Sequence, residues 1–217
     1  MELWDLYNEN RELLGKTHVR GEELPDGCLH LAVHVWIKNS EGKYLISQRS
    51  ENKDRYPLYF ECVGGSVLAG ETSEQAALRE AFEEVGVKLD ESKGSVVYTK
   101  TRTIVSGVKH NDIMDVWLFE FDGEPSLESA TTDEVCAVDW RTPEEIMELY
   151  KSQKLVPTLE YFFDVVQNAQ IKKTQNIKKN TSKNNKNKKK IKKLSENSRY
   201  FDFYDDIKSG CHKVIDW

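Results

Sequence analysis

The sequence predicts an α/β fold, an α/β/α sandwich in which helices cover both faces of a mixed β-sheet. Residues 30–37 are apolar on both faces of an expected strand, as a central strand would be. Further strand-like segments follow, and two helical patterns begin at capping signals, Thr72 and Thr142. A chain of 217 residues with 38% hydrophobic content is long enough for one such domain with appendages.

The expected strands follow from apolar alternation and from the turn residues between them. An N-terminal hairpin turns at the polar Asn-Glu-Asn sequence of residues 8–10, and the Asn-Ser-Glu-Gly sequence of residues 39–42 is a second turn. The strand that ends at Val63 is expected to enter a loop at Gly64 and Gly65. In chain order, the expected strands are residues 3–7, 13–19, 30–37, 44–49, 59–63, 96–105, 113–121 and 135–140.

Three helices are expected between and after these strands. The first starts at Thr72, which would form a capping box with Gln75, and it stops at Gly86. The second starts at Thr142 and runs to about residue 149, with a proline at its first position. A last helix is expected over residues 157–170.

The first helix carries three carboxylates on one side. Glu80, Glu83 and Glu84 fall within an arc of about 100°, because residues i, i+3 and i+4 are neighbours on a helix. Their repulsion needs a cation, and hard oxygen ligands at this density suit Mg²⁺ or Mn²⁺. A merely solvated acidic face is disfavoured, because residues 65–87 contain no lysine to relieve the repulsion. The opposite, apolar side would dock on the sheet and hold the acids outward; it consists of Ala77, Leu78, Ala81, Phe82 and Val85.

The spacing of residues 65–87 resembles the signature of the Nudix hydrolases. Every fixed position of that signature is filled, namely Gly65, Glu71, Arg79, Glu80, Glu83, Glu84 and Gly86. The resemblance covers about residues 28–150 and implies a Nudix-type α/β/α sandwich. It also implies an enzyme in which water attacks one phosphorus of a small-molecule diphosphate.

The resemblance implies roles for individual residues. The ligands that it implies for one to three Mg²⁺ or Mn²⁺ ions are the backbone carbonyl of Gly64 and the side chains of Glu80, Glu83 and Glu84. The metals would polarise phosphoryl oxygens and help to generate hydroxide. Arg79 would brace Glu71, although the sequence equally allows a pair with Glu83 one turn on. The candidates for the general base are Glu83 first, then Glu128 and Glu134.

Residues 3–20 and 30–37 are similar to the branch that includes isopentenyl-diphosphate isomerases and their hydrolase relatives. In the isomerases a catalytic cysteine directly precedes the first glycine of the signature, whereas here Gly64 precedes Gly65 and Cys62 lies further back. Hydrolysis is therefore favoured over isomerisation, and a binding module without turnover is the third hypothesis. A nucleoside diphosphate derivative and an isoprenoid diphosphate both remain open as substrate.

Substrate recognition is expected in two loops, residues 51–59 and 106–112, because loops carry much of the binding function of a fold. Arg20 and Arg49 are candidates for phosphate contacts, although surface arginines are commoner. The aromatic and imidazole side chains that are expected to be structural rather than ligand-binding are Tyr59, Phe60, Trp117, His30, His34 and His110.

Charge divides the chain. Eleven of its 31 basic residues lie in residues 171–194, which contain no acid, so the rest carries 20 basic against 37 acidic residues, a balance of −17. The acidic body is expected to repel nucleic acid, while the Lys/Asn-rich segment is expected to be a disordered linker, with weak nucleic-acid contact as its alternative. The expected divisions are an extension (1–27), the Nudix domain (28–170), the linker and a C-terminal segment of unknown structure (195–217).

Two absences bear on location. The sequence has no apolar run of the ~20 residues that a membrane span needs, and its four cysteines are widely spaced. We therefore expect a cytoplasmic protein with reduced thiols and no membrane contact. A homodimer remains open.

Overall fold

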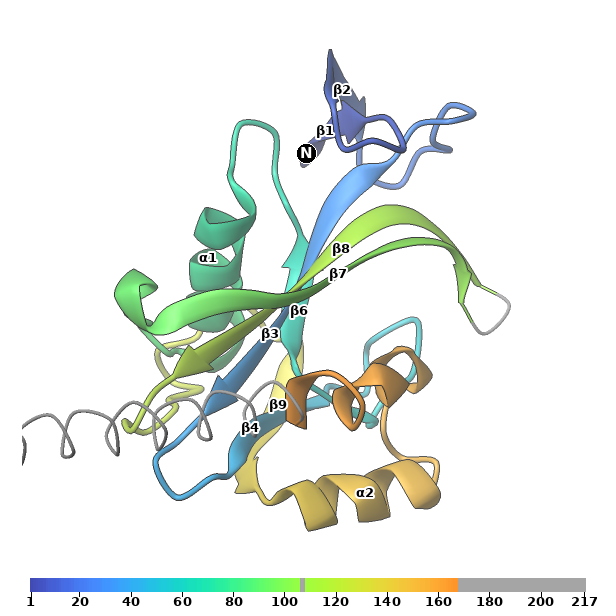
Figure 1. Cartoon of the computed structure of the whole chain (residues 1–217). Helices are drawn as coiled ribbons and strands as arrows, with labels where there is room; N and C mark the ends of the chain where they lie inside the picture. Colours follow the sequence, from blue (N-terminus) through green and yellow to red (C-terminus); the bar gives the residue numbers. More distant parts are fainter. Residues whose placement is uncertain (106–107, 168–217) are drawn as a thin grey trace, which may run out of the picture. The chain divides into compact units, whose positions relative to one another are not determined.

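The computed structural model describes residues 1–105 and 108–167, and a mixed β-sheet lies at its centre (Figure 1). The sheet has the order β5-β4-β3-β8-β7, with β6 paired to β3 and β9 paired to β4. Strands β3 and β8 are parallel and the other pairs are antiparallel; β1 and β2 form a separate hairpin. The strands are β1 (Leu3–Tyr7), β2 (Leu13–Val19), β3 (His30–Lys38), β4 (Tyr44–Arg49), β5 (Phe60–Glu61), β6 (Val63–Ser66), β7 (Gly94–Val105), β8 (Val108–Glu120) and β9 (Val135–Arg141).

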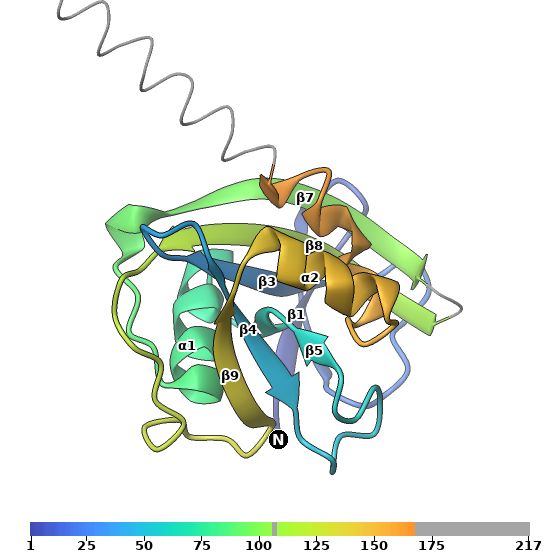
Figure 2. The same ribbon diagram turned by 90° about the horizontal axis from the view of Figure 1, so that it is seen from below.

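Helices cover both faces of this sheet, so the predicted α/β/α sandwich is confirmed (Figure 2). Helix α1 packs on one face, and α2 with η2 packs on the other. Both α-helices start at the expected capping boxes, Thr72 with Gln75 and Thr142 with Glu145. The helices are α1 (Ser73–Val85), α2 (Pro143–Lys151) and two short 3₁₀-helices, η1 (Glu91–Lys93) and η2 (Pro157–Phe162).

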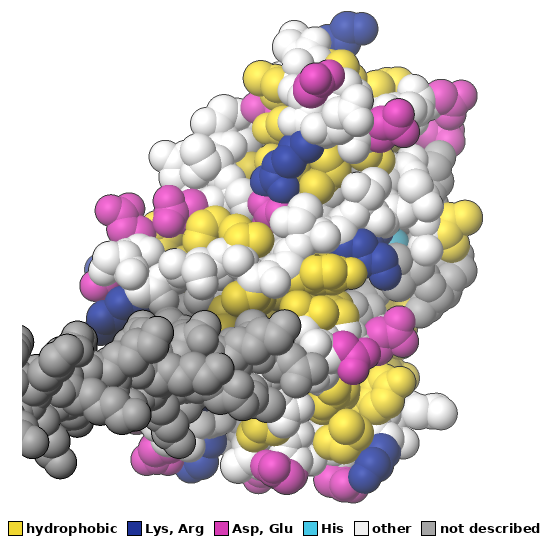
Figure 3. Space-filling model, in the orientation of Figure 1, with side chains coloured by type: hydrophobic (Ala, Val, Ile, Leu, Met, Phe, Trp, Pro, Cys, Tyr) yellow, Lys and Arg dark blue, Asp and Glu magenta, His cyan; other side chains and the backbone are white. Residues whose placement is uncertain are grey.

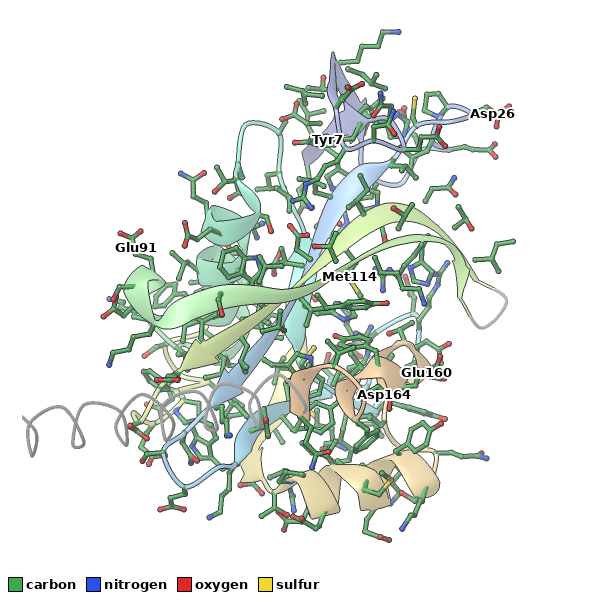
Figure 4. All side chains as sticks on the ribbon, viewed as in Figure 1. Tyr7, Asp26, Glu91, Met114, Glu160 and Asp164 are labelled. Atoms are coloured by element: carbon green, nitrogen blue, oxygen red, sulfur yellow. The ribbon has the colours of Figure 1, made fainter. Side chains whose placement is uncertain are left out.

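Strand β3 separates two apolar layers, as its two-sided pattern predicts. Its odd-numbered residues from Leu31 to Ile37 pack with Ala77, Ala81 and Val85 of α1. Trp36 faces the other layer with Met114 of β8, which lies near the middle of the sheet in Figure 4, and with Phe162 of η2. The remaining residues of this second face, His30, Ala32 and His34, border a cavity described below.

Three expectations about the elements are wrong. Gly64 and Gly65 lie within strand β6 rather than in a loop, paired to β3 opposite His34 and Val33. Strand β8 starts at Val108, so most of the expected loop 106–112 extends the β7–β8 pair. The last helix begins as the 3₁₀-helix η2, because its buried residues Leu159 and Phe162 are three apart and share one side of a three-residue turn.

Several predictions lie outside the described residues, namely the linker 171–194, the segment 195–217 and the end of the expected helix 157–170. Within the described part of the chain, no helix combines the length and apolarity that crossing a membrane requires. On the face shown in Figure 3, acidic side chains are scattered along the edges rather than gathered in one patch.

Gly86 ends helix α1, and its replacement by alanine is expected to destabilise the fold. The residue has φ 67°, and a Cβ there would overlap the backbone oxygen of Ser126, whose N–H caps the carbonyl of Val85. We expect Gly86→Ala to lower the free energy of unfolding by about 2–4 kcal/mol, measured by urea denaturation.

Gly42→Ala is the matched control for this effect. Gly42 also has a positive φ, 87°, but a Cβ there would meet nothing within 4 Å. It should therefore lose only the backbone term of about 1–2 kcal/mol. Equal losses in the two variants would contradict the role assigned to Ser126.

Candidate active site

Helix α1 brings its acidic side against strand β6. The backbone N–H of Gly64 donates to Glu84 Oε2 at 3.3 Å, and a Cβ on Gly65 would overlap the carboxylate of Glu80. The two glycines therefore allow a helix carboxylate to lie directly on the strand backbone. The expectation that all three acids face outward is wrong for Glu84, which is buried with 6% exposure.

Arg79 lies at the centre of the other acidic groups. Its Nε and Nη2 donate to the two oxygens of Glu71 at 2.8 and 3.0 Å, a bidentate pair. Its Nη1 donates to Glu80 at 2.8 Å and to Glu83 at 2.9 Å. The sequence left two roles open for Arg79, and the structure contains both: it braces Glu71 and pairs with Glu83.

The same arginine ties the loop before α1 to the sheet. Nη2 of Arg79 donates to the backbone oxygen of Ser66 at 3.0 Å, and Glu71 accepts from the N–H of Leu68 at 3.0 Å. Burial opposes ionisation of Glu71, but the hydrogen bonds from Arg79 and Leu68 lower its pKa below the ordinary value. A charged Glu71 thus fixes the loop between β6 and α1.

The carboxylates nearest to the sheet are crowded. Burial, followed by the charges of Glu61 and Glu80, raises the pKa of Glu84 well above its ordinary value. Burial also raises the pKa of Glu80, more than the neighbouring Arg79 lowers it. Glu134 adds to the repulsion on both groups. Glu80 and Glu84 of α1, Glu61 of β5 and Glu134 of the loop before β9 therefore repel one another where α1 meets β6.

This donor set fits a hard divalent cation, because every side chain in it offers carboxylate oxygens and their charges are only partly balanced. Among the described residues, no three His, Cys, Asp or Glu side chains already converge as a ready ligand cluster. Arg79 is in contact with Glu80 and Glu83 and supplies the local positive charge. Cation binding would therefore require these two carboxylates to turn from Arg79.

The structure separates the three candidates for the general base. Glu83 is one-third exposed and is oriented by Arg79. Glu134 forms an ion pair with Lys53 and lies close enough to influence Glu80 and Glu84. Glu128 is exposed, in the loop between β8 and β9. Glu83 and Glu134 thus lie near the carboxylates of Glu80 and Glu84. Glu128 is an exposed residue of the loop and the weakest of the three candidates.

A cavity of about 310 Å³ opens beside Gly64, Gly65 and Ser66, on the sheet face opposite α1. It brings together side chains from both termini of the described chain and from the strands between them. The lining side chains that carry a charge or a ring are Trp4, Arg20, His30, His34, Arg55, Glu61, Arg102, His110 and Asp112.

One wall of the cavity is a row of charged and imidazole groups across three neighbouring strands. His30 of β3 lies opposite Asp112 of β8, which lies opposite Arg102 of β7. Arg102 donates to both oxygens of Asp112 at 2.7 and 2.6 Å, and both side chains are buried. Burial alone would raise the pKa of Asp112, but hydrogen bonds from His110 and Arg102 lower it below the ordinary value.

The expected structural histidines divide. His34 is structural, because its Nδ1 lies 2.7 Å from the hydroxyl group of Tyr161. The indole N–H of Trp36 donates to the same hydroxyl oxygen at 3.1 Å, so the hydroxyl hydrogen is free to be donated to His34 Nδ1. Burial lowers the pKa of His34 to about 3, so it stays neutral. His30 and His110 line the cavity, as His34 does, and Nε2 of His110 is buried without a hydrogen-bond partner among the described residues.

The remaining candidates are placed as follows. Trp117 is core, and its Nε1 donates to Ser73 Oγ at 2.8 Å. Tyr59 and Phe60 pack against the second apolar layer. Arg49 pairs with Glu61 at 2.5 Å, while Arg20 reaches the cavity. The cavity residues absent from the sequence-based candidates are Trp4, Arg55, Glu61, Arg102 and Asp112.

Comparisons with known proteins agree with this arrangement. Residues 29–163 match the family described as NUDIX domain. The chain is 42% identical over 164 residues to an uncharacterized Nudix hydrolase of Listeria monocytogenes, covering 75% of this chain and 91% of the relative. It is 28% identical over 127 residues to an isopentenyl-diphosphate Delta-isomerase of Citrobacter koseri, covering 57% and 67%. A crystal structure of DR0079 from Deinococcus radiodurans superposes with a TM-score of 0.57 at 26% identity, covering 72% of this chain and 93% of DR0079.

Proposed function

Since the chain belongs to the NUDIX domain family, we propose that it is a Mg²⁺- or Mn²⁺-dependent diphosphohydrolase that cleaves a diphosphate linked to an organic group. The Nudix resemblance of residues 65–87 is confirmed, and with it a hydrolase of pyrophosphate bonds. The observation that carries the finer proposal is the arginine-braced group of acids beside Gly64 and Gly65, at the edge of a cavity.

The proposed ligands of the metal are the side chains of Glu80, Glu83 and Glu84 with the backbone carbonyl of Gly64. When bound, Mg²⁺ supplies positive charge that polarises the phosphoryl oxygens and stabilises the leaving phosphate. Burial keeps Glu84 beside the strand, so the helix presents its carboxylates at a fixed place.

Side chains of the chain itself would accept the proton of the attacking water. We assign Glu83 as the base that accepts a proton from the attacking water, whose oxygen bonds to phosphorus as the bridging P–O bond breaks. Arg79 donates to Glu83 Oε2 in the metal-free structure, and Glu83 would exchange this contact for the cation while Glu71 keeps Arg79 in place. Glu134 is the second candidate for the base, and its ion pair with Lys53 would have to open for that role.

Two features favour hydrolysis over isomerisation. Cys62 has 3% exposure, and burial raises the pKa of its thiol well above the ordinary value, so it is a poor nucleophile. Gly64, with no reactive side chain, precedes Gly65. The intact group of acids disfavours a binding module without turnover.

The lining of the cavity favours a polar organic group. Six of its side chains are Arg or His, so an isoprenoid tail would bury little apolar surface there. A nucleoside, which presents a polar ring edge, suits the cavity better. We therefore rank nucleoside diphosphate derivatives above isoprenoid diphosphates.

A screen of diphosphate compounds with Mg²⁺ tests the proposal. Wild type should release phosphate-containing products from at least one nucleoside diphosphate derivative, and Glu83→Gln should slow that reaction by at least about 10²-fold. Turnover that persists in Glu83→Gln would reject the assignment of the base. Isomerisation of isopentenyl diphosphate that Cys62→Ser abolishes would reject hydrolysis in favour of the isomerase hypothesis.

A further inference from the structure

The N-terminal hairpin lies outside the matched NUDIX segment, yet it contributes to the cavity. The family match begins at residue 29, whereas Trp4 of β1 and Arg20, directly after β2, both line the cavity. We propose that this hairpin is the specificity wall of the substrate site, in which Trp4 packs against the ring of the substrate and Arg20 faces its phosphate end. The inference rests on the proposed function and adds the residues that select the organic group.

The hairpin is fixed to the sheet by an ion pair whose carboxylate is buried and whose arginine is partly exposed. Nη1 and Nη2 of Arg11 donate to the two oxygens of Asp115 at 2.7 and 2.5 Å, and the Asp115 side chain is only 2% exposed. Thr99 Oγ1 donates to the same carboxylate at 2.7 Å. An isolated buried carboxylate would be costly, so Asp115 needs Arg11 in place. The hairpin is therefore a docked part of the domain.

The hairpin also contacts the loop that precedes α1. The N–H of Ala69 donates to the backbone oxygen of Leu3 at 2.8 Å, and the N–H of Gly70 donates to Asp5 Oδ2 at 2.7 Å. The next residue, Glu71, holds Arg79. The strand that carries Trp4 is thus hydrogen-bonded directly to the loop of the candidate active site.

Trp4 forms a flat wall with His30. The two rings stack with centroids 4.0 Å apart and planes 13° from parallel. The indole Nε1–H is buried and has no partner among the described residues, and Nε2 of His110, which lines the same cavity, is also buried without one. Buried polar atoms are normally paired with protein, water or a ligand, so a ligand in the cavity that offers an acceptor would satisfy Nε1 of Trp4. A ligand that packs a planar ring on the indole and offers a separate acceptor in the indole plane meets both requirements at Trp4.

Arg20 follows β2 and lies opposite Glu2, two residues before Trp4. It pairs with Glu2 at 2.6 Å, and both side chains are about half exposed. Its pKa is raised by that hydrogen bond first, and further by the charges of Glu134 and Glu80. Arg20 lines the cavity together with Gly64 and Gly65, and the charge of Glu80, a proposed metal ligand, acts on it, so it lies where the phosphates of a substrate would be expected. A ring at Trp4 and phosphates near Arg20 define a nucleoside phosphate as the ligand class.

Isothermal titration calorimetry with AMP, CMP, GMP, UMP and ribose 5-phosphate tests the role of Trp4 without requiring turnover. Trp4→Ala should weaken the best-bound nucleoside monophosphate by about fivefold to 150-fold, the range for one base–aromatic contact. Its affinity for ribose 5-phosphate should change less than about twofold, since that probe lacks the ring. Leu14→Ala on β2, a truncation of an exposed apolar side chain in the same hairpin, should change neither affinity.

Trp4→Phe keeps an aromatic ring against His30 and removes the indole N–H, so it separates the effect of packing from that of hydrogen bonding. Because it keeps the ring, it also tests the role of Trp4 if Trp4→Ala fails to fold. We expect it to recover part of the lost affinity. In steady-state kinetics, Trp4→Ala should raise KM for a nucleoside diphosphate derivative and change kcat less than about threefold. Equal losses for ribose 5-phosphate, or no loss for any nucleotide, would overturn the inference. Metal-dependent turnover that is indifferent to Trp4 would overturn it too while leaving the proposed hydrolase intact.

Discussion

Replacing Glu84 by glutamine is expected to remove most of the hydrolytic activity and, at the same time, to raise the thermal stability of the metal-free protein. The carboxylate is buried and lies near Glu61, Glu80 and Glu134. Glutamine keeps an oxygen for the N–H of Gly64 but removes a charge that costs free energy to bury. Loss of a metal ligand should lower kcat/KM by about 10²–10³-fold, the size of effect found when one charge-stabilising group is removed.

Both effects are measured on the same two preparations. Thermal unfolding in EDTA should show the higher midpoint for Glu84→Gln, by about 2–4 °C if the variant gains about 1 kcal/mol. Glu74→Gln, in the first turn of the same helix, is the control and should keep wild-type activity. A Glu84→Gln protein that is less stable than wild type would show that the carboxylate contributes to folding rather than to the site.

Helix α1 and its ends could be predicted because the signals are local. Thr72, Gln75 and Gly86 act through hydrogen bonds within four residues of the chain, and the structure contains each of them. The spacing of Glu80, Glu83 and Glu84 places them on one side for the same reason. Which of them would be buried could not be predicted, because that depends on strand β6 passing beside Glu84.

The cavity could not be predicted in this way, because no short segment contains it. Trp4, Arg55 and Arg102 come from three distant parts of the chain and meet only through the sheet order. The row of His30, Asp112 and Arg102 depends on the register of three strands, and the sequence was expected to form a loop at residue 112. The buried ion pair of Arg102 and Asp112 forms only because β7 and β8 extend past residue 112, which the sequence does not predict.

The prediction of a loop at Gly64 and Gly65 is wrong for a related reason. Two consecutive glycines commonly mark a loop, because glycine adopts conformations that other residues avoid. Here neither Gly64 nor Gly65 has a positive φ, and what both positions require is the absence of a side chain. That requirement comes from Val33 and Glu80, which lie on other elements.

Gly65→Ala is accordingly expected to reduce activity strongly with little loss of stability. A Cβ at this position would overlap the carboxylate of Glu80, which is the far end of a flexible side chain and can move away. The displaced carboxylate would leave both its place beside β6 and its 2.8 Å hydrogen bond from Arg79. Because a shift of about 1 Å in a catalytic group can cost about 10²-fold in rate, we expect a loss of that order in kcat/KM.

Gly64→Ala provides the contrasting control from the neighbouring residue. Its Cβ would lie 2.5 Å from the backbone oxygen of Val33, which belongs to the central strand and cannot turn aside. This variant should lose about 1–3 kcal/mol of unfolding free energy in urea, whereas Gly65→Ala should lose less than about 1 kcal/mol. If Gly65→Ala proves as unstable as Gly64→Ala, its loss of activity would follow from a damaged strand, and the claim that β6 keeps a glycine to make room for Glu80 would be wrong.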